Sequence, residues 1–121
     1  MTLLHELYAV QGQSPWLDNL RRDEILNGHV ADLVARGVRG ITSNPTIFQK
    51  AIMSSSAYDE QIARSAKRGD SIHQIYWDLV VDDVIEACRI LSRVYDDSNG
   101  DDGFVSLEVD PVSYTHLRAH E

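Results

Sequence analysis

The chain has 121 residues, the length of one small domain and far short of the roughly 250 residues of a complete (β/α)₈ barrel. Hydrophobic residues make up 43% and charged residues 25% of it, a balance that favours a globular protein over a disordered one. The net charge of −8 argues against nonspecific nucleic-acid binding, because phosphates repel an acidic surface.

The sequence carries no sign of a membrane segment or of export. No stretch approaches the ~20 apolar residues of a membrane span, and the first eleven residues contain Glu6 but no basic start. Cys88 is the only cysteine, which excludes a disulfide framework and a thiolate zinc site. We therefore expect a cytoplasmic protein that does not bind membranes.

The chain begins with a predicted helix followed by a short strand. Apolar residues recur at helical spacing over Thr2–Gln11, and Gly12 ends the helix. Pro15–Leu20 is expected to form the strand. Because side chains alternate along a strand, Trp16 and Asp18 would share one face.

A second helix and a second strand follow. Arg21–Arg36 is predicted to be helical with a weak point at Asn27-Gly28, and Gly37 stands where a helix C-terminal cap belongs. The second strand, Val38–Ser43, comes at once. The order strand, helix, strand indicates a βαβ unit, and hence parallel strands.

The second strand ends in a polar cluster, Thr42-Ser43-Asn44, before Pro45. A residue before proline is pushed away from the α region, and proline is well suited to the first position of a helix. By alternation, Thr42 and Asn44 share one face and Ser43 takes the other. The carboxyl ends of parallel strands are where α/β barrels place their chemistry.

Helices are expected over Pro45–Met53, from about Ser54 to Lys67, and over Ile72–Tyr95. The last of these is the longest and has a strongly amphipathic pattern. Its apolar residues form a predicted core stripe, widened on one side and including the cysteine: Val80, Val84, Ala87, Leu91 and Val94, with Val81, Ile85, Cys88 and Tyr95 beside them.

A third strand is predicted at Phe104–Val109. Its apolar residues would face the helices, while Ser106 and Glu108 would face the other way. We expect the fold to end at residue 111 and Val112–Glu121 to be an unrelated or unstructured tail. Two histidines in that tail, His116 and His120, have the spacing of a metal-binding pair on a helix. We expect both to be solvated side chains that bind no metal.

Four polar residues at the three strand ends make the candidate site. They share the face opposite the apolar one: Asp18, Thr42, Asn44 and Glu108. Two carboxylates and an amide near one cavity suit general acid–base chemistry on a hydroxylated carbonyl compound. Different surroundings could hold the two carboxylates at different pKa values.

A nucleophile for such chemistry is missing from the strand ends. The chain has two lysines, Lys50 and Lys67, and both fall in predicted helices at positions expected to be exposed. An amine is needed to form a Schiff base with a carbonyl group. Neither lysine is predicted to serve.

Three stretches of the chain resemble the transaldolase family. They are the segments Gly12–Asp18, Gly40–Phe48 and Val105–Pro111, and the likeness extends from about Leu4 to Pro111. The second and third stretches are specific in combination. The resemblance implies a helix-rich α/β fold, namely the first three βα units of a (β/α)₈ TIM barrel.

The resemblance also implies an activity. Transaldolases transfer a dihydroxyacetone unit from sedoheptulose 7-phosphate to glyceraldehyde 3-phosphate, in the nonoxidative pentose phosphate pathway. They do so through a lysine Schiff base and without a metal or organic cofactor. The implied partners are therefore sugar phosphates, whereas the oligomeric state is left open.

By resemblance, Asp18 matches the acid–base aspartate of the family and Glu108 the glutamate that acts through a water molecule. Thr42 and Asn44 match residues that hold the hydroxyls of the dihydroxyacetone unit. The family's Schiff-base lysine, on a fourth strand, and its phosphate-binding arginines have no counterpart here. We therefore expect an amino-terminal part of a transaldolase that is inactive by itself.

Three alternatives remain open from the sequence. The chain could be a noncatalytic interaction module that uses the amphipathic helix Val80–Tyr95 as a partner-binding surface. It could instead belong to another Schiff-base aldolase of the same barrel class. It could also be part of a fusion with a second enzyme.

Overall fold

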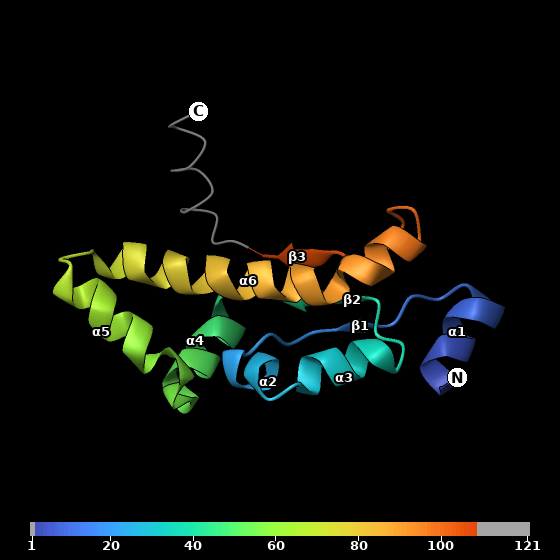
Figure 1. Cartoon of the computed structure of the whole chain (residues 1–121), viewed down its shortest axis with the longest axis horizontal. Coiled ribbons are helices and arrows are strands. Elements are labelled where there is room, and N and C mark those ends of the chain that lie inside the picture. The colour runs from blue at the N-terminus through green and yellow to red at the C-terminus, as the bar shows by residue number, and fades with distance from the viewer. Residues whose placement is uncertain (1, 109–121) are drawn as a thin grey trace.

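A computed structural model describes residues 2–108 of the chain (Figure 1). The strands are β1 (Trp16–Leu17), β2 (Gly40–Ser43) and β3 (Val105–Leu107), and they form one parallel sheet in the order β1-β2-β3. The helices are α1 (Leu3–Gln11), α2 (Arg22–Leu26), α3 (His29–Ala35), α4 (Pro45–Ser54), the 3₁₀ turn η1 (Ser56–Tyr58), α5 (Asp59–Lys67) and α6 (Ile72–Asp97).

Parallel strands joined by helices confirm the predicted α/β fold of a partial barrel. Helix α6 runs the length of the molecule beside β3, and α1 and α5 lie at opposite ends (Figure 1). All three strands are shorter than the sequence predicts. The first leaves the sheet after Leu17, because the chain then turns to bury Leu20 completely in the core.

The sheet register fixes which side chains share a face. Trp16 pairs with Gly40, and Thr42 pairs with Ser106, so these four residues lie on one face. The opposite face is apolar. It contributes the wholly buried Ile41 and its partly buried neighbours to the core: Leu17, Val105 and Leu107.

The helices complete the core over the apolar face of the sheet. Val30 of α3, Phe48 of α4 and Leu91 of α6 are each fully buried and pack in one cluster with Ile41. A smaller cluster around Tyr58 and further residues joins α4, η1 and the first half of α6. One face of the sheet is thus covered by helices, as parallel strands require.

The amphipathic pattern of α6 holds only for its central stripe. Val80, Ala87 and Leu91 are buried as predicted. The predicted widening of the stripe is wrong, and so is the placement of the cysteine in the core, because these residues are exposed: Val81, Ile85, Cys88 and Tyr95. Helix α6 contacts α3 and β3 along only a narrow strip of its surface. Residues one position further round the helix therefore face away from the sheet and α3.

A buried polar cluster ties α2 to η1, α5 and α6. The Arg22 guanidinium donates from Nε to Asp83 Oδ1 at 2.7 Å and from Nη1 to Gln61 Oε1 at 2.6 Å. The Tyr58 hydroxyl donates to Asp83 Oδ2 at 2.6 Å, and it accepts from the Arg22 backbone N–H at 2.9 Å. Every hydrogen bond in this cluster joins residues at least 25 positions apart in the chain.

Burial and hydrogen bonding have opposite effects on the pKa of Asp83. Asp83 is 2% exposed, and burial raises its pKa. Hydrogen bonds from Tyr58 and Arg22 and the positive charge of Arg22 oppose that rise. In the folded protein, hydrogen bonds from these two partners therefore replace the water that would otherwise stabilise the Asp83 carboxylate.

A second polar cluster lies at the amino ends of the strands. Asp102 accepts from Arg39 Nε at 2.7 Å and from Ser14 Oγ at 2.8 Å. The Arg39 guanidinium carbon lies 3.5 Å from the centre of the Tyr8 ring, a cation–π contact that holds α1 against the sheet. Burial opposes ionisation of Asp102, but the hydrogen bonds from Arg39 and Ser14 outweigh it and lower its pKa.

The first prediction concerns the buried cluster. Arg22→Met leaves the Asp83 carboxylate without its cation, so we expect the free energy of unfolding to fall by about 3 kcal/mol. Urea denaturation followed by circular dichroism measures the loss. Arg36→Met is the matched control, because the Arg36–Asp32 pair is 64% and 54% exposed and its loss should cost under about 0.5 kcal/mol. Equal losses in the two variants would contradict a special role for the cluster.

The second prediction concerns pH. The pKa of Asp102 is lower in the folded than in the unfolded protein, so its stabilisation is present above the unfolded pKa and is lost as pH falls through the folded pKa. Asp102→Asn should therefore lower the free energy of unfolding by about 2 kcal/mol at pH 7, and by much less at pH about 3. Urea midpoints at the two pH values test this.

Asp32→Asn is the control for that experiment, since its ion pair with Arg36 is exposed and its loss should cost under about 0.5 kcal/mol. A gap between Asp102→Asn and the parent chain that stays constant from pH 7 to pH 3 would contradict the role of the Asp102 charge.

Candidate active site

The candidate residues stand at the carboxyl ends of the three strands, where the sequence analysis expects them. Asp18 directly follows β1, Asn44 directly follows β2 and Glu108 directly follows β3, while Thr42 lies within β2. The register places Thr42 on the face opposite Ile41, whereas Asp18, Asn44 and Glu108 lie one residue past the last assigned residue of their strands. Asp18 and Glu108 are exposed, and Thr42 and Asn44 are partly buried.

The backbone around Glu108 extends the parallel pairing beyond the last assigned strand residue. The Glu108 N–H donates to the Ser43 carbonyl at 3.0 Å, so the ladder between the two strand ends continues to the candidate glutamate. Ser43 lies on the other face, as predicted, and is 3% exposed. Its hydroxyl has no hydrogen-bond partner among the described residues.

Asn44 has a structural role that the sequence analysis did not assign to it. Its Oδ1 accepts from the Ile47 backbone N–H at 3.0 Å, which caps the N-terminus of α4, with Pro45 at the first helical position. The cap uses only the amide oxygen. The amide NH₂ is the group that could donate to a substrate hydroxyl.

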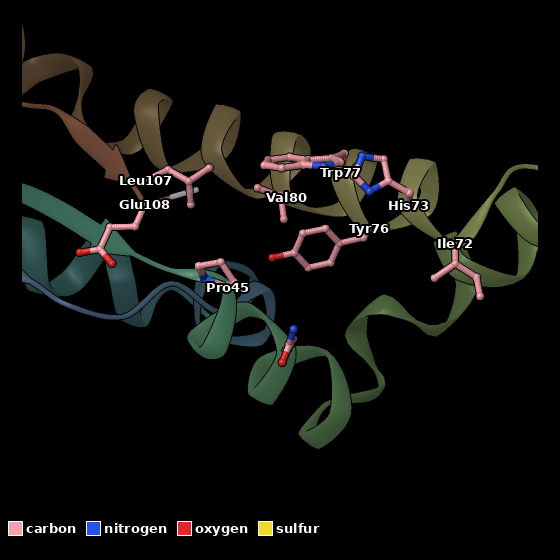
Figure 2. A pocket seen from close by; sticks show the side chains of 9 residues that line it. Pro45, Ile72, His73, Tyr76, Trp77, Val80, Leu107 and Glu108 are labelled. Atoms are coloured by element: carbon pink, nitrogen blue, oxygen red, sulfur yellow. The ribbon is translucent and has the colours of Figure 1, made fainter. Parts of the chain in front are cut away.

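Glu108 also borders a cavity of about 550 Å³ between the start of α4, the first half of α6 and the end of β3 (Figure 2). Glu108 stands at one end of the cavity and Ile72 at the other, with Tyr76 and Trp77 between them (Figure 2). The other three candidate residues do not line it. The four candidate residues thus lie at the carboxyl ends of the three strands, but Glu108 is the only one of the four that lines this cavity.

The aromatic wall of that cavity received no role in the sequence analysis. Tyr76 and Trp77 are in edge-to-face contact, with ring centres 5.6 Å apart, and His73 lies 6.3 Å from Trp77. Burial raises the pKa of Tyr76. The signal in the sequence was a cluster of rings on successive turns of one helix, but a helical pattern does not say what faces those rings.

The two lysines stand away from the strand ends. Lys50 is exposed on α4 and Lys67 is exposed on α5. Among the described residues, no group of three or more histidine, cysteine, aspartate or glutamate side chains is arranged to hold a metal ion. His116, His120 and the expected boundary at residue 111 lie outside the described residues.

The sequence as a whole matches a known family. A sequence profile described as transaldolase/fructose-6-phosphate aldolase matches residues 15–119, most of the chain. The chain belongs to this family. The match runs past residue 111, where the sequence analysis places the end of the fold, and that boundary stays a prediction.

Individual transaldolases are close relatives. The chain is 52% identical over 109 residues to the transaldolase of Frankia alni, a match that covers 89% of this chain and 29% of that protein. It is 50% identical over 102 residues to transaldolase 2 of Nostoc punctiforme, covering 84% of this chain and 27% of the relative. The chain thus spans less than a third of the length of these transaldolases.

Among residues 2–108, no helix has the length and apolar character to span a membrane.

The third prediction separates the two roles of Asn44. Asn44→Ala removes the cap of α4 and should lower the free energy of unfolding by about 1 kcal/mol, whereas Asn44→Asp keeps a capping oxygen and should change it by only a few tenths. Thermal and urea denaturation of both variants measure this. If Asn44→Asp is as unstable as Asn44→Ala, the amide NH₂ rather than the cap carries the structural role.

Proposed function

We propose that this chain carries the strand-end part of a transaldolase active site. In the proposed reaction a dihydroxyacetone unit passes from sedoheptulose 7-phosphate to glyceraldehyde 3-phosphate, within the nonoxidative pentose phosphate pathway in the cytoplasm. The observation that supports it most directly is the position of these residues in the sheet: Thr42 lies on the face opposite Ile41, and Asp18, Asn44 and Glu108 each directly follow one of three adjacent parallel strands. Family membership supplies the reaction class.

The proposed chemistry begins when a lysine amine attacks the ketone carbon of the donor sugar and a water molecule leaves, forming a Schiff base. Asp18 accepts the proton of the adjacent sugar hydroxyl as the carbon–carbon bond breaks, and the aldehyde product leaves. Glu108 acts through a water molecule in the proton transfers. Thr42 and Asn44 hold the hydroxyls of the three-carbon unit that stays bound.

The lysine of this reaction is not one of the two in the chain. Lys50 and Lys67 lie on the exposed faces of α4 and α5, and neither side chain belongs to the strand ends. A Schiff base needs an amine held at the substrate carbonyl, next to the groups that transfer protons. We therefore infer that the chain alone forms no Schiff base and has no transaldolase activity.

The fourth prediction tests both parts of this proposal by borohydride trapping. The chain is incubated with fructose 6-phosphate and sodium borohydride and analysed by mass spectrometry, and we expect no stable adduct. A hybrid protein, in which residues 1–108 replace the matching part of the Frankia alni transaldolase, should trap one adduct, on a lysine contributed by the relative. The 52% identity between the two makes this exchange practicable.

Within the hybrid, Asp18→Asn should slow transfer at least about 100-fold, since it removes the acid–base group, while leaving thermal stability nearly unchanged. Asp23→Asn is the control, because Asp23 pairs with Arg21 on the outside of the barrel unit. A stoichiometric adduct on Lys50 or Lys67 of the chain alone would overturn the inferred inactivity. Unchanged turnover in Asp18→Asn would overturn the assignment of Asp18.

A further inference from the structure

Trp16 occupies an unusual position on the candidate face of the sheet. It lies in β1 and pairs with Gly40, so its indole ring is on the same face as Thr42. A Cβ atom added to Gly40 would overlap three carbon atoms of the Trp16 ring. The ring therefore lies directly on the backbone of β2 and fills the space that any other residue at position 40 would need.

That close approach explains a glycine as the first residue of the central strand. Glycine weakens a strand through lost entropy and missing side-chain contacts, so a strand glycine often marks a place where another group comes close. At position 40 the approaching group is an aromatic ring of the neighbouring strand.

Hydrogen bonds hold the ring in place from the amino ends of the strands. The Trp16 Nε1–H donates to Ser14 Oγ at 3.1 Å. Ser14 Oγ in turn donates to Asp102, which Arg39 also binds at 2.7 Å. Yet the residue remains 37% exposed, so the ring is fixed in orientation while part of its surface faces outward.

The residues that follow on the same face are polar. Two residues further toward the carboxyl end, Asp18 follows Trp16 in the first segment and Thr42 follows Gly40 in β2. Thr42 pairs with Ser106 of β3. A rigid aromatic surface thus lies directly below the paired hydroxyl residues Thr42 and Ser106, with Asp18 next along the chain after β1. A short polyhydroxylated carbon chain matches this arrangement, because its hydroxyls can bind the polar layer while its C–H groups contact the ring.

We propose that Trp16 is the floor of the substrate site, where its ring contacts the carbon chain of the bound three-carbon unit and limits how deeply that unit enters. The proposal rests on the proposed function and adds a substrate-contacting residue to it. Ser14 and Asp102 are then positioning residues, which act by fixing the orientation of the indole.

The chain offers an internal control for testing this, because it has two tryptophans. Trp77 lies on α6 and lines the cavity beside Glu108, on the helix-covered side of the sheet. The two indole N–H groups give separate signals in a ¹H–¹⁵N spectrum of the labelled chain, assigned with Trp16→Phe and Trp77→Phe. Each indole can thus be followed independently.

The fifth prediction is tested by titrating the full chain with dihydroxyacetone, a noncovalent probe that needs no lysine. We expect the Trp16 indole signal to shift together with the backbone amides of Thr42 and Asn44, while the Trp77 indole signal stays in place. Trp16→Leu should weaken binding about fivefold, as measured from the Thr42 shift, because it removes the aromatic contact. Ser14→Ala should weaken binding less and should move the Trp16 signal before any ligand is added.

The outcomes distinguish this proposal from the proposed function. If Thr42 and Asn44 respond but the Trp16 indole does not, or if Trp16→Leu binds as tightly as the parent chain, Trp16 is only a filler of the sheet face and the proposed function stands. If only Trp77 responds, or if none of these signals responds, the probe does not bind at the strand ends and both proposals fail.

Discussion

The burial of Ile41 in the central strand is the constraint on which the arrangement of this protein depends. Ile41 is wholly buried between Leu17 of β1 and Val105 of β3, against the helices. A shift of one residue in either pairing would turn the neighbouring strand over, so that a side chain of its other face would replace Leu17 or Val105 beside Ile41. Because side chains alternate along β2, the burial of Ile41 places Thr42 on the opposite face of the sheet.

Two clusters of arginine and aspartate hold the helices around this sheet, one at each end of the strands. Arg22 and Asp83 join α2 to α6 near the carboxyl ends, four residues after the candidate Asp18. Arg39 and Asp102 join the first residues of the central strand to the loop before β3, near the amino ends. Ion pairs this well buried stabilise only when every partner is present, so they specify one arrangement of helices rather than simply adding stability.

The site is built on elements of very different rigidity. Thr42 lies within a paired strand, and Asn44 is fixed by capping α4, whereas Asp18 and Glu108 are exposed residues just past the ends of short edge strands. Family membership and the strand-end positions support the transaldolase proposal, in which neither Lys50 nor Lys67 forms the Schiff base. The ring of Trp16, held by Ser14, adds a rigid surface beneath the polar groups.

The sequence by itself determined the order of the elements, the parallel strands and the side of the sheet on which Thr42 lies. Strand alternation and the placement of Pro45 at the first position of a helix are local rules that can be read along the chain. Only the tertiary structure decided that Cys88 is exposed, that Arg22 meets Asp83 across 61 positions and that the Trp16 ring covers Gly40. The physical reason is that helical periodicity indicates only which residues share a face of the helix. How much of that face is covered, and by which residues, depends on contacts between segments that are distant in the chain.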